Sequence, residues 1–222
     1  MNSRQRFGIA AGLVVLSAIA SVLAAPDLPA VMVSHWNAAG TPNGTMAKPL
    51  ALALVPAIGV GLLALFAAIP RIDPLRENIA AFRPYYDWLV VIVAGFLLAI
   101  HLATIAFNLG YAVDMTVVTI VTVAVLYYYL GMLLPHAERN WFVGIRTPWT
   151  LSSPDVWERT HVLGGRLFKL SAVLALVGLL FGSAAIYFVL VPALLTAGIT
   201  FGYSYLVYER LERDGPSSPG LS

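Results

Sequence analysis

The chain has 222 residues, of which 59% are hydrophobic, 11% are charged and none is cysteine, and its formal net charge is +2. A soluble domain carries about 25% charged residues, so this composition indicates a protein whose main solvent is a lipid bilayer. The lack of cysteine excludes disulfides, thiolate metal sites and cysteine nucleophiles, and the small net charge gives no sign of direct nucleic-acid binding.

Five uncharged runs divide the chain, at residues 7–25, 49–70, 88–109, 115–135 and 170–208. About 20 residues of helix cross a hydrocarbon core, so the last run is too long for one crossing and we expect it to turn near Phe181-Gly182-Ser183. Backbone groups inside a bilayer must be satisfied within the structure, and these run lengths fit helices rather than barrel strands. The predicted fold class is therefore an all-α membrane protein, a bundle of six transmembrane helices.

Basic residues predict the orientation of this bundle. Of the 13 Lys and Arg residues, all except Lys48 lie before the first run, after the last, or in alternate loops. Because such residues are retained on the cytoplasmic side, we expect both chain ends in the cytoplasm of a multi-pass plasma-membrane protein. A cleaved signal peptide has an apolar region of about 7–15 residues, so the longer run from Phe7 to Ala25 favours a retained helix.

Two segments outside the runs are expected to carry no specific function. Residues 71–87 mix charges with Tyr85 and Tyr86, which predicts a solvated cytoplasmic connector. The tail, residues 209–222, is expected to be disordered and contains no evident motif for docking a repressor.

The outer loop, residues 26–48, lies between the first two runs. Alternation of residue types from Val31 to Asn37 predicts a short strand. Turn-forming residues at 37–40 and 41–44 predict that the loop folds back over the outer face, either as a receptor surface or as a connector anchored by Trp36. His35 lacks an obvious second ligand, so we do not expect a metal there. Asn43-Gly44-Thr45 also matches a glycosylation sequon.

The main inner loop, residues 136–166, contains an aromatic segment at 140–151 with no helical or strand period. The sequence Ser152-Ser153-Pro154-Asp155 predicts a helix start, and we expect a short inner amphipathic helix over residues 156–162 that ends at Gly164-Gly165. Arg146 either binds an anionic group through its forked donors or lies at the interface as a simple anchor.

Few residues in or beside the predicted spans are suited to binding a metal or moving a proton. Glu158-x-x-His161 has the spacing of a di-metal site, but only one such motif is present and no metal is expected. Of the His, Asp, Glu, Lys and Arg residues, only His101 lies well inside a predicted span. We expect it to have a hydrogen-bonded structural role rather than to relay protons. The glycine pairs 8/12, 178/182 and 198/202 predict close helix packing, within the bundle or between subunits.

The two loops together resemble a known family. Leu28-Pro29, the segment from His35 to Gly44 and Lys48 resemble the extracytoplasmic signature of the DUF1648 region. The segment from Asn140 to Leu151, with Trp157 and Thr160-His161, resembles the signature of the SdpI family, membrane immunity proteins of bacterial cannibalism systems. This resemblance implies a DUF1648-like region over residues 1–70 and a four-span SdpI-like region over residues 88–208.

The resemblance further implies a non-enzymatic protein without a cofactor that protects its cell against a secreted toxic peptide. In the founding system the toxin-engaged protein also captures a winged-helix repressor at the membrane. The expected toxin-facing residues are His35, Trp36, Asn37, Gly40, Asn43 and Lys48. The expected inner functional motif comprises Asn140, Trp141, Gly144, Arg146, Thr147, Pro148, Trp149, Trp157 and His161. Two alternatives stay open: a membrane enzyme using Arg146 and His161, and a small-solute transporter.

Overall fold

The computed structural model describes residues 1–214, and within them six helices are long and apolar enough to cross a membrane. These are α1 (Ser3–Ala24), α2 (Lys48–Ile72), α4 (Arg83–Asn108), α5 (Met115–Leu133), α7 (Pro154–Gly178) and α8 (Tyr187–Asp214). The predicted six-helix membrane protein is confirmed.

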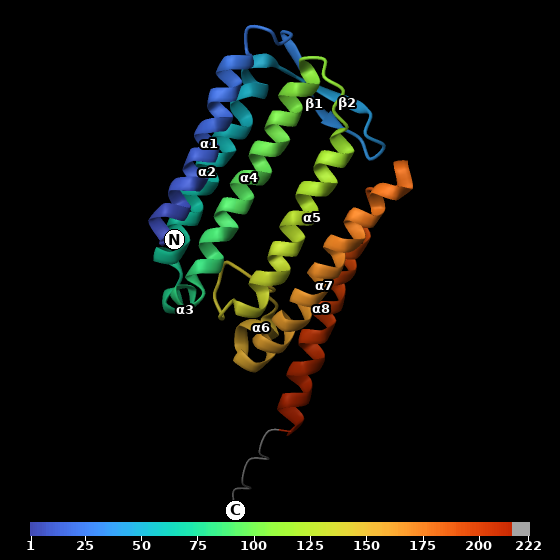
Figure 1. Cartoon of the computed structure of the whole chain (residues 1–222). Helices are drawn as coiled ribbons and strands as arrows, with labels where there is room; N and C mark the ends of the chain where they lie inside the picture. The colour runs from blue at the N-terminus through green and yellow to red at the C-terminus, as the bar shows by residue number, and fades with distance from the viewer. Residues whose placement is uncertain (215–222) are drawn as a thin grey trace, which may run out of the picture.

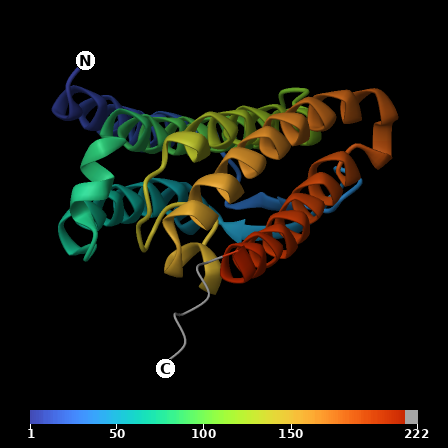
Figure 2. The ribbon, with the colours of Figure 1, turned by 90° about the horizontal axis from the view of Figure 1, so that it is seen from below.

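The long helices are arranged as a folded row. α1 packs against α2 and α4, α4 against α5, α5 against α7, and α7 against α8. Seen along the helices, α2 and α8 lie well apart on one side of the α1–α4–α5–α7 row (Figure 2). One apolar cluster joins α1 and α4 around Val14 and Val90, and a second joins α5, α7 and α8 around Ile120 and Ala175.

Short elements gather at the two ends of the row. At one end β1 (Val31–Trp36) pairs antiparallel with β2 (Pro42–Ala47), beside the ends of α4 and α5 (Figure 1). At the other end lie α3 (Arg76–Ala81), the 3-10 turn η1 (Leu134–His136) and α6 (Pro148–Ser152). We call these the hairpin end and the loop end. The start of α1 and the described end of α8 both lie at the loop end, so both are on one side of the membrane (Figure 1).

The long last run turns where the sequence predicts. α7 ends at Gly178, a 3-10 segment η2 (Leu179–Ala184) follows, and α8 begins at Tyr187. Gly182 has a φ of 54°, a left-handed conformation that glycine adopts without a steric penalty. The division of this run into two helices is therefore confirmed.

The start of α7 agrees with the prediction, but its end does not. Ser153 is the N-cap, and its hydroxyl accepts a 3.4 Å hydrogen bond from the Val156 N–H. The helix then continues through Gly164 and Gly165, so the prediction of a short helix ended by these glycines is wrong. A Cβ on Gly165 would lie 2.7 Å from Pro135, so this glycine serves the close approach of α7 to the end of α5.

Four further segments differ from expectation. Residues 42–44, expected to form a turn, begin β2, and the aromatic segment contains the short helix α6. The segment from 71 to 87 is solvated only in part, because Ile79, Phe82, Tyr86 and Asp87 are buried while Arg76 and Glu77 are exposed. In the tail, α8 continues to Asp214, and the expected disorder of residues 215–222 concerns positions outside the described residues.

The glycine pairs have different environments. A Cβ on Gly178 would lie 2.5 Å from Phe188, so this glycine packs α7 against α8. At Gly8, Gly12, Gly198 and Gly202 a Cβ would meet nothing within 4 Å among the described residues. These four glycines therefore mediate no close helix packing within residues 1–214.

Candidate functional site

Asn37 and Gly40 shape the tip of the hairpin. The Asn37 side-chain oxygen accepts hydrogen bonds from the N–H groups of Ala39 and Thr41, each 3.0 Å long. Gly40 has a φ of 76°, and a Cβ there would lie 2.5 Å from the Thr116 hydroxyl oxygen on α5. These two predicted residues therefore form the turn and let it approach α5.

Trp36 lines two hollows beneath the hairpin. Its ring packs edge-on against Phe107 of α4, with 5.2 Å between the centroids. One hollow, of about 570 Å³, lies between the hairpin tip, the α4–α5 loop and the α7–α8 turn, and the other, of about 470 Å³, lies between β1, α4 and α5. The indole Nε1 is buried and has no hydrogen-bond partner within residues 1–214. Buried donors are rarely left unsatisfied, so the Trp36 N–H is available to a ligand in either hollow.

The remaining predicted residues of the hairpin have distinct contacts. His35 and Asn43 are exposed and face each other across the strands, with 2.5 Å between His35 Nδ1 and the Asn43 side-chain oxygen. The Lys48 ammonium donates to the carbonyls of Ala25 and Leu28, both at 2.9 Å. Lys48 thus closes the base of the hairpin, while His35 and Asn43 lie on its exposed surface.

Asn108 at the end of α4 was not singled out in the sequence, although it connects the hairpin to the bundle. Its side chain accepts a 2.7 Å hydrogen bond from the Val33 N–H and donates at 2.9 Å to the Val33 carbonyl. The Asn108 amide therefore pairs with the backbone N–H and carbonyl of Val33, as a neighbouring strand would. The available signal was an amide at the outer edge of an apolar run.

At the loop end, Asn140 folds residues 138–143 around itself. It is fully buried; its oxygen accepts from the N–H groups of Phe142 and Val143, and its nitrogen donates to the carbonyls of Glu138 and Val143, at 2.6 to 2.9 Å. An amide has this many hydrogen-bonding positions, so an apolar residue of the same size would leave several backbone groups unpaired.

Trp157, His161 and Gly144 form a packed unit. The Trp157 indole donates to the Ala137 carbonyl at 2.6 Å, and its ring stacks on the His161 ring with 4.0 Å between centroids. His161 Nδ1 donates to the Trp157 carbonyl at 2.7 Å, so Nε2 accepts the 3.0 Å hydrogen bond from the Ile145 N–H. Gly144 lies against this pair with a φ of 126°, and a Cβ there would clash with His161 Nε2.

Thr147 and Trp149 connect the loop to α8. Thr147 caps α6 in a reciprocal pair of hydrogen bonds with Thr150, and its hydroxyl donates to the buried Ser204 hydroxyl at 3.0 Å. Trp149 packs against Phe201 and Tyr205, with centroids 5.2 and 5.1 Å away. The loop is therefore fixed to α8 by one polar contact and two aromatic contacts.

Two residues outside the predicted motif fix the other side of the loop. Asp73 is buried, and one of its carboxylate oxygens accepts a 3.0 Å hydrogen bond from the Trp141 N–H. Asn78 donates to the Arg139 carbonyl at 2.6 Å. The sequence had placed both in a connector without function, and only the fold brings this segment against the motif.

Other members of the motif are exposed. Trp141 is 50% exposed and Phe142 37% exposed, next to the exposed Arg146 and Pro148. The Arg146 guanidinium donates to the Trp141 backbone carbonyl, which holds the Arg146 side chain beside Trp141. The motif thus divides into buried residues that maintain the loop and an exposed aromatic and cationic surface, which we call the Trp141 surface.

A hollow of about 470 Å³ opens at the loop end between α3, α4 and α7, lined partly by Tyr85, His136 and His161. The rings of His136 and Tyr85 are stacked, with His136 Nε2 3.0 Å from the Tyr85 hydroxyl and Nδ1 2.9 Å from the Met132 carbonyl. Both nitrogens of His136 and of His161 are used in hydrogen bonds. Within residues 1–214 no group of three or more His, Cys, Asp or Glu side chains is placed to hold a metal ion.

Between the two ends, His101 has the structural contact that we expected. It is buried, and its Nε2 lies 2.7 Å from the Ser21 hydroxyl, which donates to the Leu52 carbonyl at 2.9 Å. The histidine therefore takes part in a hydrogen-bonded junction of α1, α2 and α4.

Comparisons with known proteins match both halves of the chain. Residues 136–204 match the model of the SdpI/YfhL protein family, and residues 12–60 match the domain of unknown function DUF1648. The chain is also similar to the immunity protein SdpI of Bacillus subtilis (strain 168), with 24% identity over 200 residues that cover 90% of this chain and 94% of that protein. No solved structure matches. Both regions are present in the order that the resemblance implied, so the resemblance of this chain to the SdpI family is confirmed.

Proposed function

We propose that this chain is a membrane immunity protein that protects its cell against a secreted toxic peptide. The observation that carries the proposal is the likeness over 90% of the chain to a protein named for immunity. The arrangement of His161 supports a non-enzymatic role, because the ring is buried and both nitrogens are hydrogen-bonded, which leaves neither free to move a substrate proton.

We further propose that the hairpin end faces outward from the plasma membrane and the loop end faces the cytoplasm. The loop end carries every Lys and Arg of the chain except Lys48, and such residues are retained on the cytoplasmic side. The toxic peptide then meets the hairpin first.

The proposed site for the peptide is the pair of hollows on either side of Trp36. Apolar side chains lie exposed around them, with Tyr111 68% and Phe181 53% exposed. An indole with an unused N–H between two hollows suits an extended peptide, because peptides offer both apolar side chains and backbone carbonyls.

The test is the survival of a deletion strain that carries plasmid-borne variants, challenged with peptides secreted by the same and related strains. Trp36→Ala is expected to reduce protection by about tenfold or more, since buried tryptophans often dominate binding energy. Trp88→Ala is the matched control, because Trp88 is an exposed tryptophan on α4 at the loop end. Membrane abundance and melting temperature of each variant verify folding. Survival that is the same with and without the chain across the panel would refute the immunity function.

The Trp141 surface is the proposed site where the chain signals to the cell interior by binding a cytoplasmic repressor. Its support is the exposure of Trp141 and Phe142 on a loop whose backbone is otherwise fixed by hydrogen bonds. Exposed aromatic residues beside an arginine are typical of protein interfaces.

Crosslinking and pull-down from native membranes, with and without peptide challenge, test this second step. We expect a DNA-binding protein to be captured by the wild type after challenge and to be lost from the double variant Trp141→Ala/Phe142→Ala. Trp88→Ala again serves as control. Capture of no DNA-binding protein from challenged cells would leave protection without signalling.

A further inference from the structure

A hollow of about 450 Å³ lies at the loop end where α1, α2 and α4 meet, and it shares no lining residue with the hollows beside Trp36 or with the Trp141 surface. It is lined by Ser3, Arg4, Phe7, Ala67, Arg71 and Arg83. We call it the arginine pocket. Three of its six lining residues are arginines and none is acidic, although it lies at the ends of three membrane-spanning helices.

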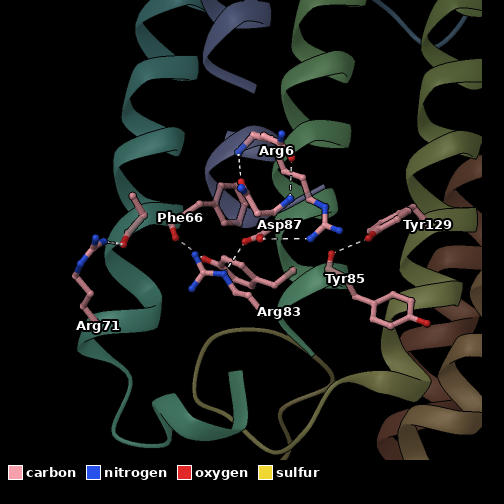
Figure 3. A network of polar contacts seen from close by, with 11 residues as sticks. Arg6, Phe66, Arg71, Arg83, Tyr85, Asp87 and Tyr129 are labelled. Carbon is pink, nitrogen blue, oxygen red and sulfur yellow. Dashed lines mark hydrogen bonds and ion pairs between the residues drawn. The ribbon is translucent and has the colours of Figure 1, made fainter. Parts of the chain in front are cut away.

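One buried carboxylate balances only part of this charge. Asp87 is fully buried, with Oδ1 2.6 Å from Arg83 Nε and Oδ2 3.7 Å from an Nη atom of Arg6 (Figure 3). Arg4 and Arg71 form no ion pair within residues 1–214. The four arginines and one aspartate of this region therefore retain three positive charges.

The pocket is arranged before any ligand binds. The Arg83 guanidinium lies over the rings of Phe7 and Tyr86, at 5.8 and 5.6 Å, and its ion pair with Asp87 uses the Nε edge. Its Nη atoms have no hydrogen-bond acceptor among the described residues. Figure 3 shows Arg83 and Arg6 converging on Asp87, with Arg71 to one side on α2.

We propose that the arginine pocket binds the phosphodiester headgroup of an anionic phospholipid. Guanidinium forks match the paired oxygens of a phosphate, and basic pockets between transmembrane helices are suited to anionic headgroups. A lipid fits better than free phosphate because Phe7 and Ala67 contribute apolar lining, and Ile9 and Leu65, further along the same helices, expose apolar side chains. The bound lipid would join α1, α2 and α4.

The experiment uses the full chain in mild detergent and native mass spectrometry, with titration of phosphatidylglycerol or phosphatidylcholine. We expect one retained phosphatidylglycerol and no retained phosphatidylcholine. Arg4→Gln/Arg71→Gln leaves the Arg83–Asp87 pair intact and is expected to weaken binding at least about tenfold, since each arginine near anionic lipid contributes a factor of about five. Arg4→Lys/Arg71→Lys keeps the charge without the forks and is expected to show an intermediate loss; it replaces the first variant if that one does not fold.

The control Arg159→Gln/Arg166→Gln removes the same charge from exposed positions on α7 and is expected to bind as the wild type. Equal lipid retention in the Arg4/Arg71 variants and the wild type would overturn the proposal, as would an equal loss in the α7 control. Inorganic phosphate is added as a competitor, and displacement of the lipid by phosphate alone would assign the pocket to free phosphate instead.

Discussion

At the scale of single residues, Gly144 has a central place in the packing of the inner loop. Its φ of 126° is one that residues with a side chain rarely adopt, and it lies against the stacked rings of Trp157 and His161. This position allows the next N–H, that of Ile145, to reach His161 Nε2. The conformation of Gly144 and the positions of Trp157 and His161 therefore depend on one another.

Gly144→Ala is expected to destabilise the protein by about 2 kcal/mol or more, because it adds backbone strain and forces the new Cβ away from His161. The measurement is the melting temperature of the purified chain in detergent. Gly110→Ala is the control that isolates strain, since Gly110 has a φ of 90° but no heavy atom within 4 Å of its Cβ position. If the two variants melt at the same temperature, the close contact between residue 144 and His161 does not contribute to stability.

At the scale of elements, the hydroxyl of Ser21 connects three helices. It lies on α1, donates to the Leu52 carbonyl of α2 and contacts His101 of α4. Interhelical hydrogen bonds inside a membrane contribute on average about 0.6 kcal/mol, and more when several groups share one junction. Ser21 therefore supplements the apolar packing between α1 and α4.

Ser21→Ala is expected to lower the free energy of unfolding by about 1–2 kcal/mol, because it leaves two buried partners without this hydroxyl. Ser17→Ala is a closely matched control: Ser17 is also buried on α1, but its hydroxyl donates only to the Val14 carbonyl of its own helix. Unfolding in mixed micelles gives both values. An effect of Ser21→Ala no larger than that of Ser17→Ala would show that the junction adds nothing.

At the scale of the whole molecule, α4 connects the hairpin end with the loop end. At the hairpin end its Asn108 and Phe107 contact Val33 and Trp36. At the loop end its Tyr85 stacks on His136 beside the inner loop. One continuous helix therefore runs from the hairpin end to the loop end, and the His101 junction lies between them.

The proposed orientation predicts the accessibility of introduced cysteines, for which the chain offers a clean background because it has none of its own. Asn43→Cys at the exposed hairpin is expected to react with a membrane-impermeant thiol reagent in intact cells. Arg213→Cys at the described end of α8 is expected to react only after permeabilisation. The opposite labelling pattern would place the hairpin end in the cytoplasm.

The sequence alone determined the number of spans and the turn near Gly182. These follow from local properties, since run length sets a membrane crossing and a glycine in the left-handed region sets a turn. The tertiary structure decided which residues meet. Asp73 contacts Trp141 of the motif, and Asn78 contacts the neighbouring Arg139. Asp87 is buried between Arg6 and Arg83. Gly165 allows α7 to approach α5 closely and does not end a helix. Each depends on elements distant in sequence, because burial and hydrogen-bond partners arise only when helices pack against one another.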